Sequence, residues 1–187
     1  MSAERCRLCH ASAADASAIA EVYVRTWRAA YRDLLSPSLL RQMRPLRETL
    51  FWWTTLCDPR PGSATFVIED AEAGIVGFIS GGPDRGHGGA RRAEVYTLYL
   101  LPSFQRRGLG TRLLAACVRS LLASGFDSLM IWVLSGNPGR AFYEALGGVP
   151  VAARTLRLGG RLVQEVAYDW PDLHSVATAT AEPRHNS

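Results

Sequence analysis

The sequence predicts one α/β domain in which helices flank a mixed, mostly antiparallel sheet. Hydrophobic residues make up 48% and charged residues 20% of the 187 residues, a balance typical of a globular chain. Short apolar runs with strand periodicity alternate with stretches of helical periodicity. We find no internal repeat and no second region of distinct composition. We therefore predict one domain over residues 5–170 and a flexible C-terminal tail over residues 171–187.

The first third of the chain predicts one strand followed by two helices. Residues 5–10 alternate charged and apolar side chains, as in a strand. Asp15 is a suitable N-cap for a helix whose apolar residues recur every three or four positions. A second helix is expected from Ser36, because proline follows it at the first helical position. This helix has a break at Pro45 and ends before the turn at residues 58–62.

The middle of the chain predicts three strands. Residues 64–69 and 74–80 form a hairpin around the turn at residues 72–74. Residues 81–92 carry five glycines and a proline, so we expect a mobile loop there. Residues 93–101 then form the third of these strands.

The remaining elements complete an order of β, α, α, three strands, α, β, α, β, β. Helices are expected at residues 109–123 and 138–146. The near-continuous apolar run at residues 128–134 predicts a strand buried on both faces. Residues 151–158 and 161–168 predict a final hairpin. This order favours a mixed sheet covered by helices.

The most informative motif is the loop Gln105-Arg106-Arg107-Gly108-Leu109-Gly110, which joins the strand at 93–101 to the helix at 109–123. Glycine adopts backbone conformations that other residues disfavour and leaves the amides open to a ligand. The helix adds free N–H groups and a positive dipole end, which suit a diphosphate. Alternatively, the glycines serve only a tight βα turn. The segment lacks the patterns of a P-loop and of a Rossmann turn.

Together with the strand end Leu98-Tyr99-Leu100-Leu101-Pro102, this loop resembles the pyrophosphate loop of the GCN5-related N-acetyltransferase (GNAT) superfamily. The resemblance extends over residues 5–170 and is tightest over residues 94–147. It implies a GNAT-like fold with acetyl-CoA as co-substrate and no metal. It further implies direct attack of an amine on the thioester in a ternary complex. The cofactor-binding residues that it implies are Leu98, Tyr99, Leu100, Gln105, Arg106, Arg107, Gly108, Leu109, Gly110, Thr111 and Asn137.

Tyr143 is the residue that the resemblance implies as the general acid. It lies in the segment from Asn137 to Gly147, which resembles the family's Asn…Tyr…Gly pattern, although Gly148 replaces the usual aromatic residue. A phenol with an ordinary pKa near 10 can donate its proton to the leaving thiolate. Taken alone, without the loop and the resemblance, Tyr143 is better explained as a helix residue that covers the core with its hydroxyl at the surface.

Glu94 is the residue that the resemblance implies as the base. It precedes Gln105 by eleven residues, the offset of a glutamate that acts through water in histone-acetylating members of the family. The alternative is an ordinary charge at the solvated start of a strand. Other members place a glutamate five residues before the asparagine, but Trp132 occupies that position here.

Trp27 and Tyr31 lie in the part of the chain that forms the acceptor wall in the family, although aromatic residues at helical spacing can also serve only the core. Asp84 and His87 lie in the glycine-rich loop, which could close over the same site as a lid. The acceptor is expected to be a small-molecule or peptide amine, whose identity the sequence does not fix. The rival hypotheses are a non-catalytic or regulatory acyl-CoA-binding domain and an enzyme that transfers a longer acyl group.

Composition argues against several partners and compartments. The net charge of +4 is small and scattered, which argues against a nucleic-acid partner. No apolar run approaches the ~20 residues of a membrane span, and no apolar leader is visible, so we expect a cytoplasmic protein. A homodimer is compatible with the sequence.

The segment Cys6-Arg-Leu-Cys9-His10 matches a haem-attachment pattern. Its alternation of charged and apolar residues favours a strand instead, and we expect no metal there.

Overall fold

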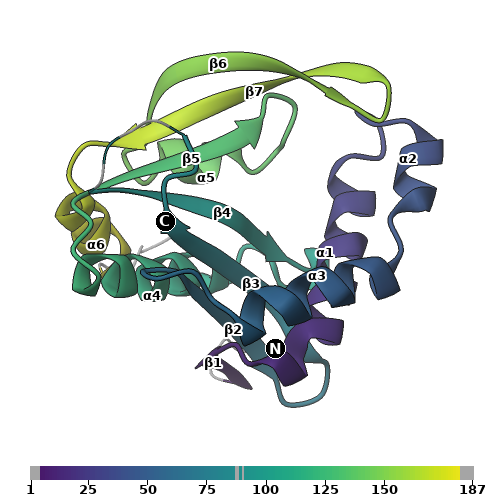
Figure 1. Cartoon of the computed structure of the whole chain (residues 1–187), viewed down its shortest axis with the longest axis horizontal. Coiled ribbons are helices and arrows are strands. Elements are labelled where there is room, and N and C mark those ends of the chain that lie inside the picture. The colour runs from purple at the N-terminus through teal and green to yellow at the C-terminus, as the bar shows by residue number, and fades with distance from the viewer. Residues whose placement is uncertain (1–4, 87–88, 90, 182–187) are drawn as a thin grey trace.

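The computed structural model describes residues 5–86, 89 and 91–181. In these residues a seven-stranded sheet has the order β1-β2-β3-β4-β5-β7-β6 (Figure 1). Only the β4–β5 pair is parallel, and the other pairs are antiparallel. The structure thus confirms a single domain with a mixed, mostly antiparallel sheet.

The strands follow the predicted order. They are β1 (Cys6–His10), β2 (Ala64–Asp70), β3 (Gly74–Pro83), β4 (Arg92–Leu100), β5 (Ser128–Leu134), β6 (Val149–Leu158) and β7 (Arg161–Trp170). The α-helices are α1 (Ala16–Ala30), α2 (Pro37–Gln42), α3 (Pro45–Cys57), α4 (Leu109–Ala123), α5 (Arg140–Glu144) and α6 (Leu173–Ala181). Two 3₁₀ turns, η2 (Ala13–Asp15) and η3 (Pro102–Phe104), precede α1 and α4.

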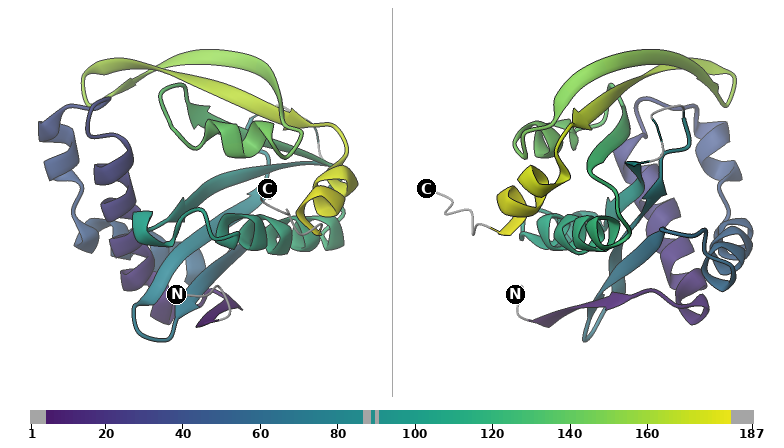
Figure 2. Two further views of the ribbon diagram at one scale, coloured as in Figure 1. Left: turned by 180° about the vertical axis from the view of Figure 1, so that it is seen from behind. Right: turned by 60° about the vertical axis from the view of Figure 1, so that its left-hand side comes forward.

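The helices cover the two faces of the sheet separately. Helices α1 and α3 pack together, and α1 contacts β3 and β4. Helix α4 packs on the opposite face against β2, β3 and β4, with α6 beside it (Figure 2). Fully buried side chains from both layers, such as Ile19 of α1 and Leu113 of α4, enclose Phe78 and Ile79 of β3. The central strands are therefore shielded on both faces.

The start of α1 differs in part from the sequence prediction. Asp15 ends the turn η2, and its Oδ2 accepts a hydrogen bond from the backbone N–H of Ser12 at 2.8 Å. Asp15 makes no side-chain cap to α1. Asp15 therefore occupies the N-cap position of α1 as predicted, but its side chain bonds back to Ser12, the N-cap of η2, and caps no N–H of α1.

Strands β4 and β5 are paired only at one end and then separate. Their ladder runs from Arg92 to Val95 on β4 and from Ser128 to Ile131 on β5. The ladder between β3 and β4 shifts register between Ser80 and Gly81, and Tyr96 is the extra residue of a bulge. A bulge increases the local twist and bend of a strand. Beyond it, β5 continues with β7 to Leu134, so a wedge opens between β4 and β5.

The glycine-rich segment 81–92 is more ordered than predicted. Gly81 to Pro83 belong to β3. A Cβ atom at Gly81 would lie 2.9 Å from the Cys117 Sγ and 3.1 Å from the Glu94 carbonyl oxygen. This glycine therefore permits close packing between β3, β4 and α4. His87, which the lid hypothesis included, lies outside the described residues.

The predicted flexible tail is wrong for residues 173–181, which form α6. Asp172 begins this helix by accepting a hydrogen bond from the His174 backbone N–H at 2.9 Å. Leu173 and Val176 are fully buried, and α6 packs on α4. The spacing of Leu173, Val176 and Thr180 is the helical signal that the small, polar composition concealed. Residues 182–187 lie outside the described part of the chain.

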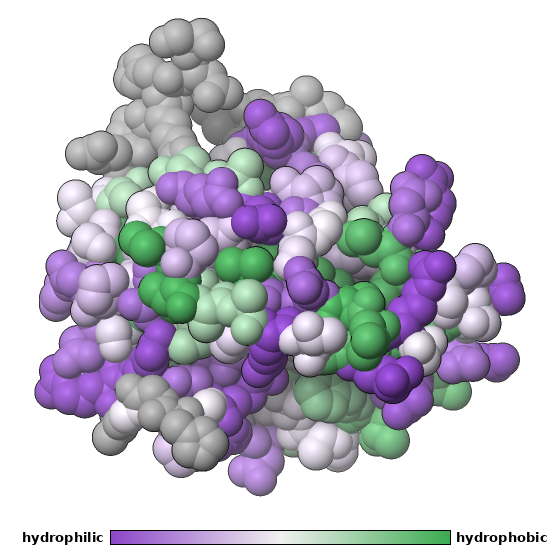
Figure 3. All heavy atoms as spheres, turned by 90° about the horizontal axis from the view of Figure 1, so that it is seen from above, coloured by the Kyte–Doolittle hydropathy of each residue, from purple (hydrophilic) through white to green (hydrophobic). Residues whose placement is uncertain are grey.

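The hairpin of β6 and β7 arches over the wedge toward the N-terminal helices (Figure 1). Near its tip, the Arg161 side chain donates a hydrogen bond to the Leu34 carbonyl at 3.2 Å. Apolar groups on this side of the molecule form patches separated by hydrophilic residues (Figure 3). Across the described residues, no helix combines the length and apolar character needed to cross a bilayer.

Candidate active site

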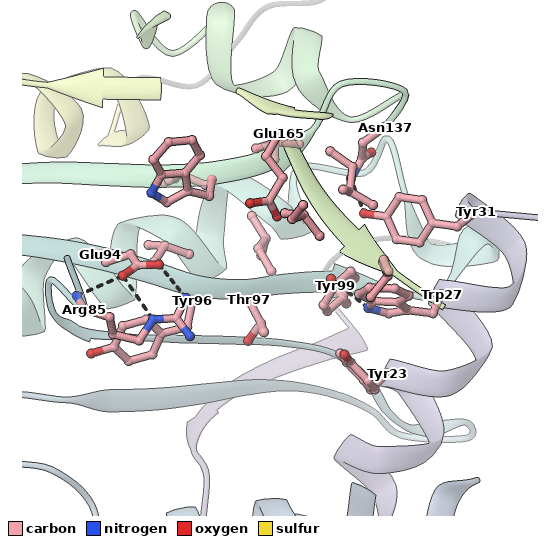
Figure 4. A pocket seen from close by; sticks show the side chains of 18 of the residues that line it. Tyr23, Trp27, Tyr31, Arg85, Glu94, Tyr96, Thr97, Tyr99, Asn137 and Glu165 are labelled. Atoms are coloured by element: carbon pink, nitrogen blue, oxygen red, sulfur yellow. Dashed lines mark hydrogen bonds and ion pairs between the residues drawn. The ribbon is translucent and has the colours of Figure 1, made fainter. Parts of the chain in front are cut away.

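A cavity of about 460 Å³ lies at the wedge between β4 and β5 (Figure 4). Helices α1 and α3, both wedge strands and the β6–β7 hairpin contribute to its wall. The predicted site residues that line it are Tyr143, Glu94, Asn137, Trp27, Tyr31, Leu98 and Tyr99. The other predicted residues, Leu100 and Gln105 to Thr111, do not line it. They form the end of β4 and the loop that enters α4.

The predicted diphosphate loop has the geometry of an anion-binding helix start. Gly108 is the N-cap of α4, and its φ of +73° is in the left-handed region that favours glycine. No side chain caps the first turn, and no acidic residue lies in it. The first backbone N–H groups of α4 are thus available to an anion.

Gly110 differs from Gly108, because its φ lies outside the left-handed region and its surroundings have room for a side chain. A Cβ atom there would lie 3.5 Å from the Leu100 Cδ1 and 3.6 Å from the Phe142 Cζ, which is ordinary van der Waals contact. Packing within the protein therefore does not require glycine at this position.

The two arginines of the loop have different surroundings. Arg107 donates a hydrogen bond to the Ser103 carbonyl and lies over the Phe104 ring, with its Cζ 5.1 Å from the ring centre. Arg106 is exposed, and its φ of +59° makes it the sole described residue other than glycine with positive φ. Arg107 is therefore held by the protein, and Arg106 presents its charge to solvent.

The end of β4 joins this loop to the wedge. Gln105 donates from Nε2 to the Leu100 carbonyl oxygen at 3.0 Å. Leu98, Tyr99 and Leu100 pair with β3 on one side. On the β5 side, the described chain gives β4 no strand partner beyond Val95. This edge is open to a ligand that extends from the loop into the wedge.

Tyr143 is positioned by α5 with its side chain 8% exposed. Its ring lies 5.3 Å from the ring of Phe142 and 6.0 Å from that of Tyr168. Burial raises the pKa of Tyr143 well above its usual value, and the nearby Tyr31 adds to the effect. The phenol therefore carries its proton at neutral pH and can act as a donor.

Glu94 is buried, with 3% of its surface exposed. Its Oε2 accepts hydrogen bonds from the Nε and the backbone N–H of Arg85, both at 3.1 Å, and its Oε1 accepts another from the Nη2 of Arg85 at 2.5 Å (Figure 4). The alternative of a solvated charge at a strand start is therefore wrong. Arg85, which the sequence analysis missed, also lies over the Tyr96 ring, with its Cζ 4.5 Å from the centre.

A second carboxylate, Glu165 of β7, also lines the cavity and was missed by the sequence analysis. Its Oε2 accepts a hydrogen bond from the Nε of Arg154 at 2.9 Å. The Arg154 Cζ lies 4.0 Å from the centre of the Trp132 ring. Within the described chain, no hydrogen bond reaches the Oε1 of Glu165. Only long-range pairing of β6, β7 and β5 brings these residues together.

Asn137 connects the wedge to α1. Its Nδ2 donates to the Tyr31 hydroxyl at 2.8 Å, and its Oδ1 accepts from the Gly139 backbone N–H at 2.7 Å. Burial raises the pKa of Tyr31 to about 12. The Nε1 of Trp27 donates to the Tyr99 hydroxyl at 2.8 Å. The predicted acceptor wall is thus part of a hydrogen-bonded aromatic cluster that also faces the cavity.

The cysteines give no sign of a metal site. Cys6 and Cys9 lie on β1 as the alternation predicts, and Cys117 is buried in α4. In the described part of the chain, no cluster of three or more histidine, cysteine, aspartate or glutamate side chains could hold a metal ion.

Solved structures of other proteins share this fold. The PaiA N-acetyltransferase of Thermoplasma acidophilum in complex with coenzyme A matches with a TM-score of 0.70 and 19% identity, covering 86% of this chain and 97% of that one. YncA, a putative acetyltransferase of Salmonella typhimurium crystallised with acetyl-CoA, matches with a TM-score of 0.66 and 20% identity, covering 90% and 94%. The fold is that of the GNAT acetyltransferases.

The sequence comparisons agree with this class. The pattern of the Acetyltransferase (GNAT) family matches residues 19–148. The N-acetyltransferase YuaI of Bacillus subtilis strain 168, itself uncharacterised, is 34% identical over 164 residues, which cover 88% of this chain and 92% of the relative. The chain belongs to the GNAT family of acetyltransferases.

Proposed function

We propose that this protein transfers the acetyl group of acetyl-CoA to an amine by direct attack in a ternary complex. The observation that carries the proposal is the wedge between β4 and β5, which connects an uncapped helix N-terminus with a cavity that contains a protonated tyrosine and carboxylates. The relatives crystallised with coenzyme A or acetyl-CoA support the choice of donor.

In this proposal the backbone binds the donor. The diphosphate contacts the N–H groups at residues 108–111, and Arg106 contributes its charge. The pantetheine arm follows the open edge of β4 at residues 98–100 toward the wedge. An N–H of this edge then faces the thioester oxygen and stabilises the charge that develops there during attack. Asn137 contributes from the other wall of the wedge.

The chemistry then needs one acid and one base. The amine nitrogen forms a bond to the acetyl carbon, and the carbon–sulfur bond breaks. Coenzyme A leaves as a thiolate and takes the proton of the Tyr143 hydroxyl. The amine loses one proton to a base before it attacks, because an amine with a pKa near 10 is mostly protonated at neutral pH. The nitrogen loses a second proton as the amide forms, and this proton restores the Tyr143 hydroxyl.

Two carboxylates in the cavity are candidates for the base. Glu94 is the one implied by the family resemblance, acting through a water molecule. Its carboxylate already accepts three hydrogen bonds from Arg85, two at Oε2 and one at Oε1, so about one of its four lone-pair sites is left for a water or a proton. The Oε1 of Glu165 has no such competitor in the described chain. Comparing the Glu94→Gln and Glu165→Gln enzymes separates the two, because only loss of the base removes the ascending limb of the pH–rate profile.

Thiol release from acetyl-CoA across a panel of amines tests the proposal. We expect turnover by the wild type and a loss of about 10²-fold or more in kcat for Tyr143→Phe, with binding of acetyl-CoA retained. Tyr168→Phe is a matched control, because this buried tyrosine lies next to Tyr143 but does not line the cavity. Binding of acetyl-CoA without acetylation of any amine would instead support a regulatory domain. Turnover only with longer acyl-CoA donors would correct the transferred group.

A further inference from the structure

We infer that the acceptor carries a second positive charge besides the amine that is acetylated, and that Glu48 binds this charge. The inference rests on the proposed function and specifies its substrate class. A free diamine and a peptide with an N-terminal amine and a basic side chain share this chemistry.

The first observation is the charge balance of the cavity. Five charged side chains line it: Glu48, Glu94, Glu165, Arg85 and Arg154. Glu94 is paired with Arg85, and Glu165 with Arg154. Glu48 forms no ion pair with any residue that the structure describes. The cavity therefore holds one uncompensated negative charge, and its arginines are already engaged.

The second observation is the aromatic surface around Glu48. Tyr23 and Trp27 of α1 and Phe51 and Trp52 of α3 line the same cavity. The ring centres of Tyr23 and Trp27 are 5.6 Å apart. In Figure 4 these two residues lie across the cavity from Glu94 and Arg85. A carboxylate beside aromatic faces is a favourable site for a cation.

The third observation is independent of charge and indicates a polar ligand. Trp52 is 3% exposed, and its Nε1 has no hydrogen-bond partner among the described residues; the buried Thr97 Oγ1 also has none. Both residues line the cavity. Buried polar atoms in native proteins are normally satisfied. A hydroxyl or carbonyl oxygen of the acceptor could accept the Trp52 N–H, which is a donor only.

These features disfavour an acceptor with a free carboxylate. Such a group would add a second uncompensated negative charge to the cavity, and no unpaired arginine lines it in the described chain. A dicationic amine instead neutralises Glu48 while its second nitrogen attacks the thioester.

Calorimetric titration of the full-length protein with coenzyme A present tests the inference without requiring turnover. The probes are 1,5-diaminopentane against pentylamine and Ala-Lys-amide against Ala-Met-amide. We expect the wild type to prefer the doubly charged member of at least one pair by about tenfold, the equivalent of 1.4 kcal/mol. The same pairs serve as substrates in the thiol-release assay.

Glu48→Gln should reduce this preference about tenfold, and Glu21→Gln should preserve it. Glu21 is a matched control because it is exposed on α1 and does not line the cavity. If Glu48→Gln is poorly folded, salt provides the second readout, because added NaCl should weaken binding of the doubly charged probe to the wild type more than binding of its singly charged match.

The outcomes separate this inference from the proposed function. Equal preference in the wild type and Glu48→Gln overturns the inference even if amines are acetylated. Absence of binding by all four probes also overturns it. Binding of a dication that depends on Glu48, without any thiol release, supports the inference and contradicts the proposed enzyme. The pair of probes that discriminates identifies the small-molecule or peptide source.

Discussion

The two sides of the wedge are built in different ways. The donor side is a contiguous stretch from Leu98 to Thr111, where the strand end, the left-handed Gly108 and the start of α4 expose backbone groups. The acceptor side consists of side chains from α1, α3, the β3–β4 loop and the β6–β7 hairpin, between Tyr23 and Glu165. One side therefore depends on local backbone conformation, and the other depends on tertiary contacts.

This difference explains how one fold can keep acetyl-CoA as its acetyl donor while the amine that accepts the acetyl group changes. A substitution on the acceptor side alters a side chain without disturbing the backbone that would bind coenzyme A. On the donor side, the recognising groups are the N–H groups themselves, which only a change of backbone conformation can remove. Variants that affect one side and spare the other therefore test the comparison directly.

The largest effect is expected from Gly108→Val. A β-branched residue is strained at a φ of +73°, and its side chain would project where the diphosphate is expected. We expect binding of acetyl-CoA to weaken by about 100-fold or more, about 2.7 kcal/mol. Calorimetric titration with acetyl-CoA measures the loss.

Gly74→Val is the matched control for backbone strain. Gly74 has a φ of +70° in the β2–β3 turn and, as at Gly108, no neighbouring atom lies within 4 Å of the position that a Cβ atom would occupy. Both substitutions should lower the free energy of unfolding by a similar ~1–2 kcal/mol. Only Gly108→Val should impair binding. Equal binding by the two variants would contradict the donor site.

The donor side could be predicted from sequence because its signals are local. The loop from Gln105 to Gly110 is contiguous, and the helix after it has a clear apolar face. The order of the elements along the chain and the α4 boundaries also follow from periodicity and turns. The wedge itself was not predictable from residues alone, because it results from the short β4–β5 ladder and the bulge at Tyr96.

The acceptor side was only partly predictable. Trp27 and Tyr31 were proposed from the family resemblance, and their helical spacing alone also fits a core role. Their partners Tyr99 and Asn137 come from distant strands and loops. The burial of Glu94 depends on Arg85, which lies in a segment whose glycines indicated mobility. Nothing in the local sequence indicates that such pairs meet.

The next effect concerns the buried tyrosines that line the cavity, which belong to the acceptor side except for Tyr99 of β4. Burial raises the pKa of Tyr23, Tyr99 and Tyr143 well above the usual value and that of Tyr31 to about 12. A raised pKa in the folded state means that stability is present below pH 10 and is lost as the pH rises above it. For Tyr31 alone we expect a loss of about 2 kcal/mol between pH 10 and 12.

Urea unfolding at pH 8 to 11.5 measures this dependence. Tyr31→Phe should unfold with a shallower dependence on pH in this range, because it removes one of the groups that ionise only on unfolding. An unchanged slope would show that Tyr31 is accessible to solvent. Because Tyr31→Phe removes only the Tyr31 hydroxyl, the difference between the wild-type and variant slopes reports on the acceptor side.

The smallest expected effect is the coupling energy between Asn137 and Tyr31, whose side chains are hydrogen-bonded in the cavity wall. Asn137→Ala removes the donor to the buried Tyr31 hydroxyl and the acceptor for the Gly139 N–H. Loss of a partner for a buried polar group costs about 1–3 kcal/mol. A double-mutant cycle with Tyr31→Phe should give a coupling energy of about 0.5–1.5 kcal/mol, measured by urea unfolding. If the two effects add without coupling, Asn137 does not position α1. If they couple and acetyl-CoA binding also weakens in Asn137→Ala, then Asn137 contributes to both the donor side and the acceptor side. The two sides are then not independent at this residue.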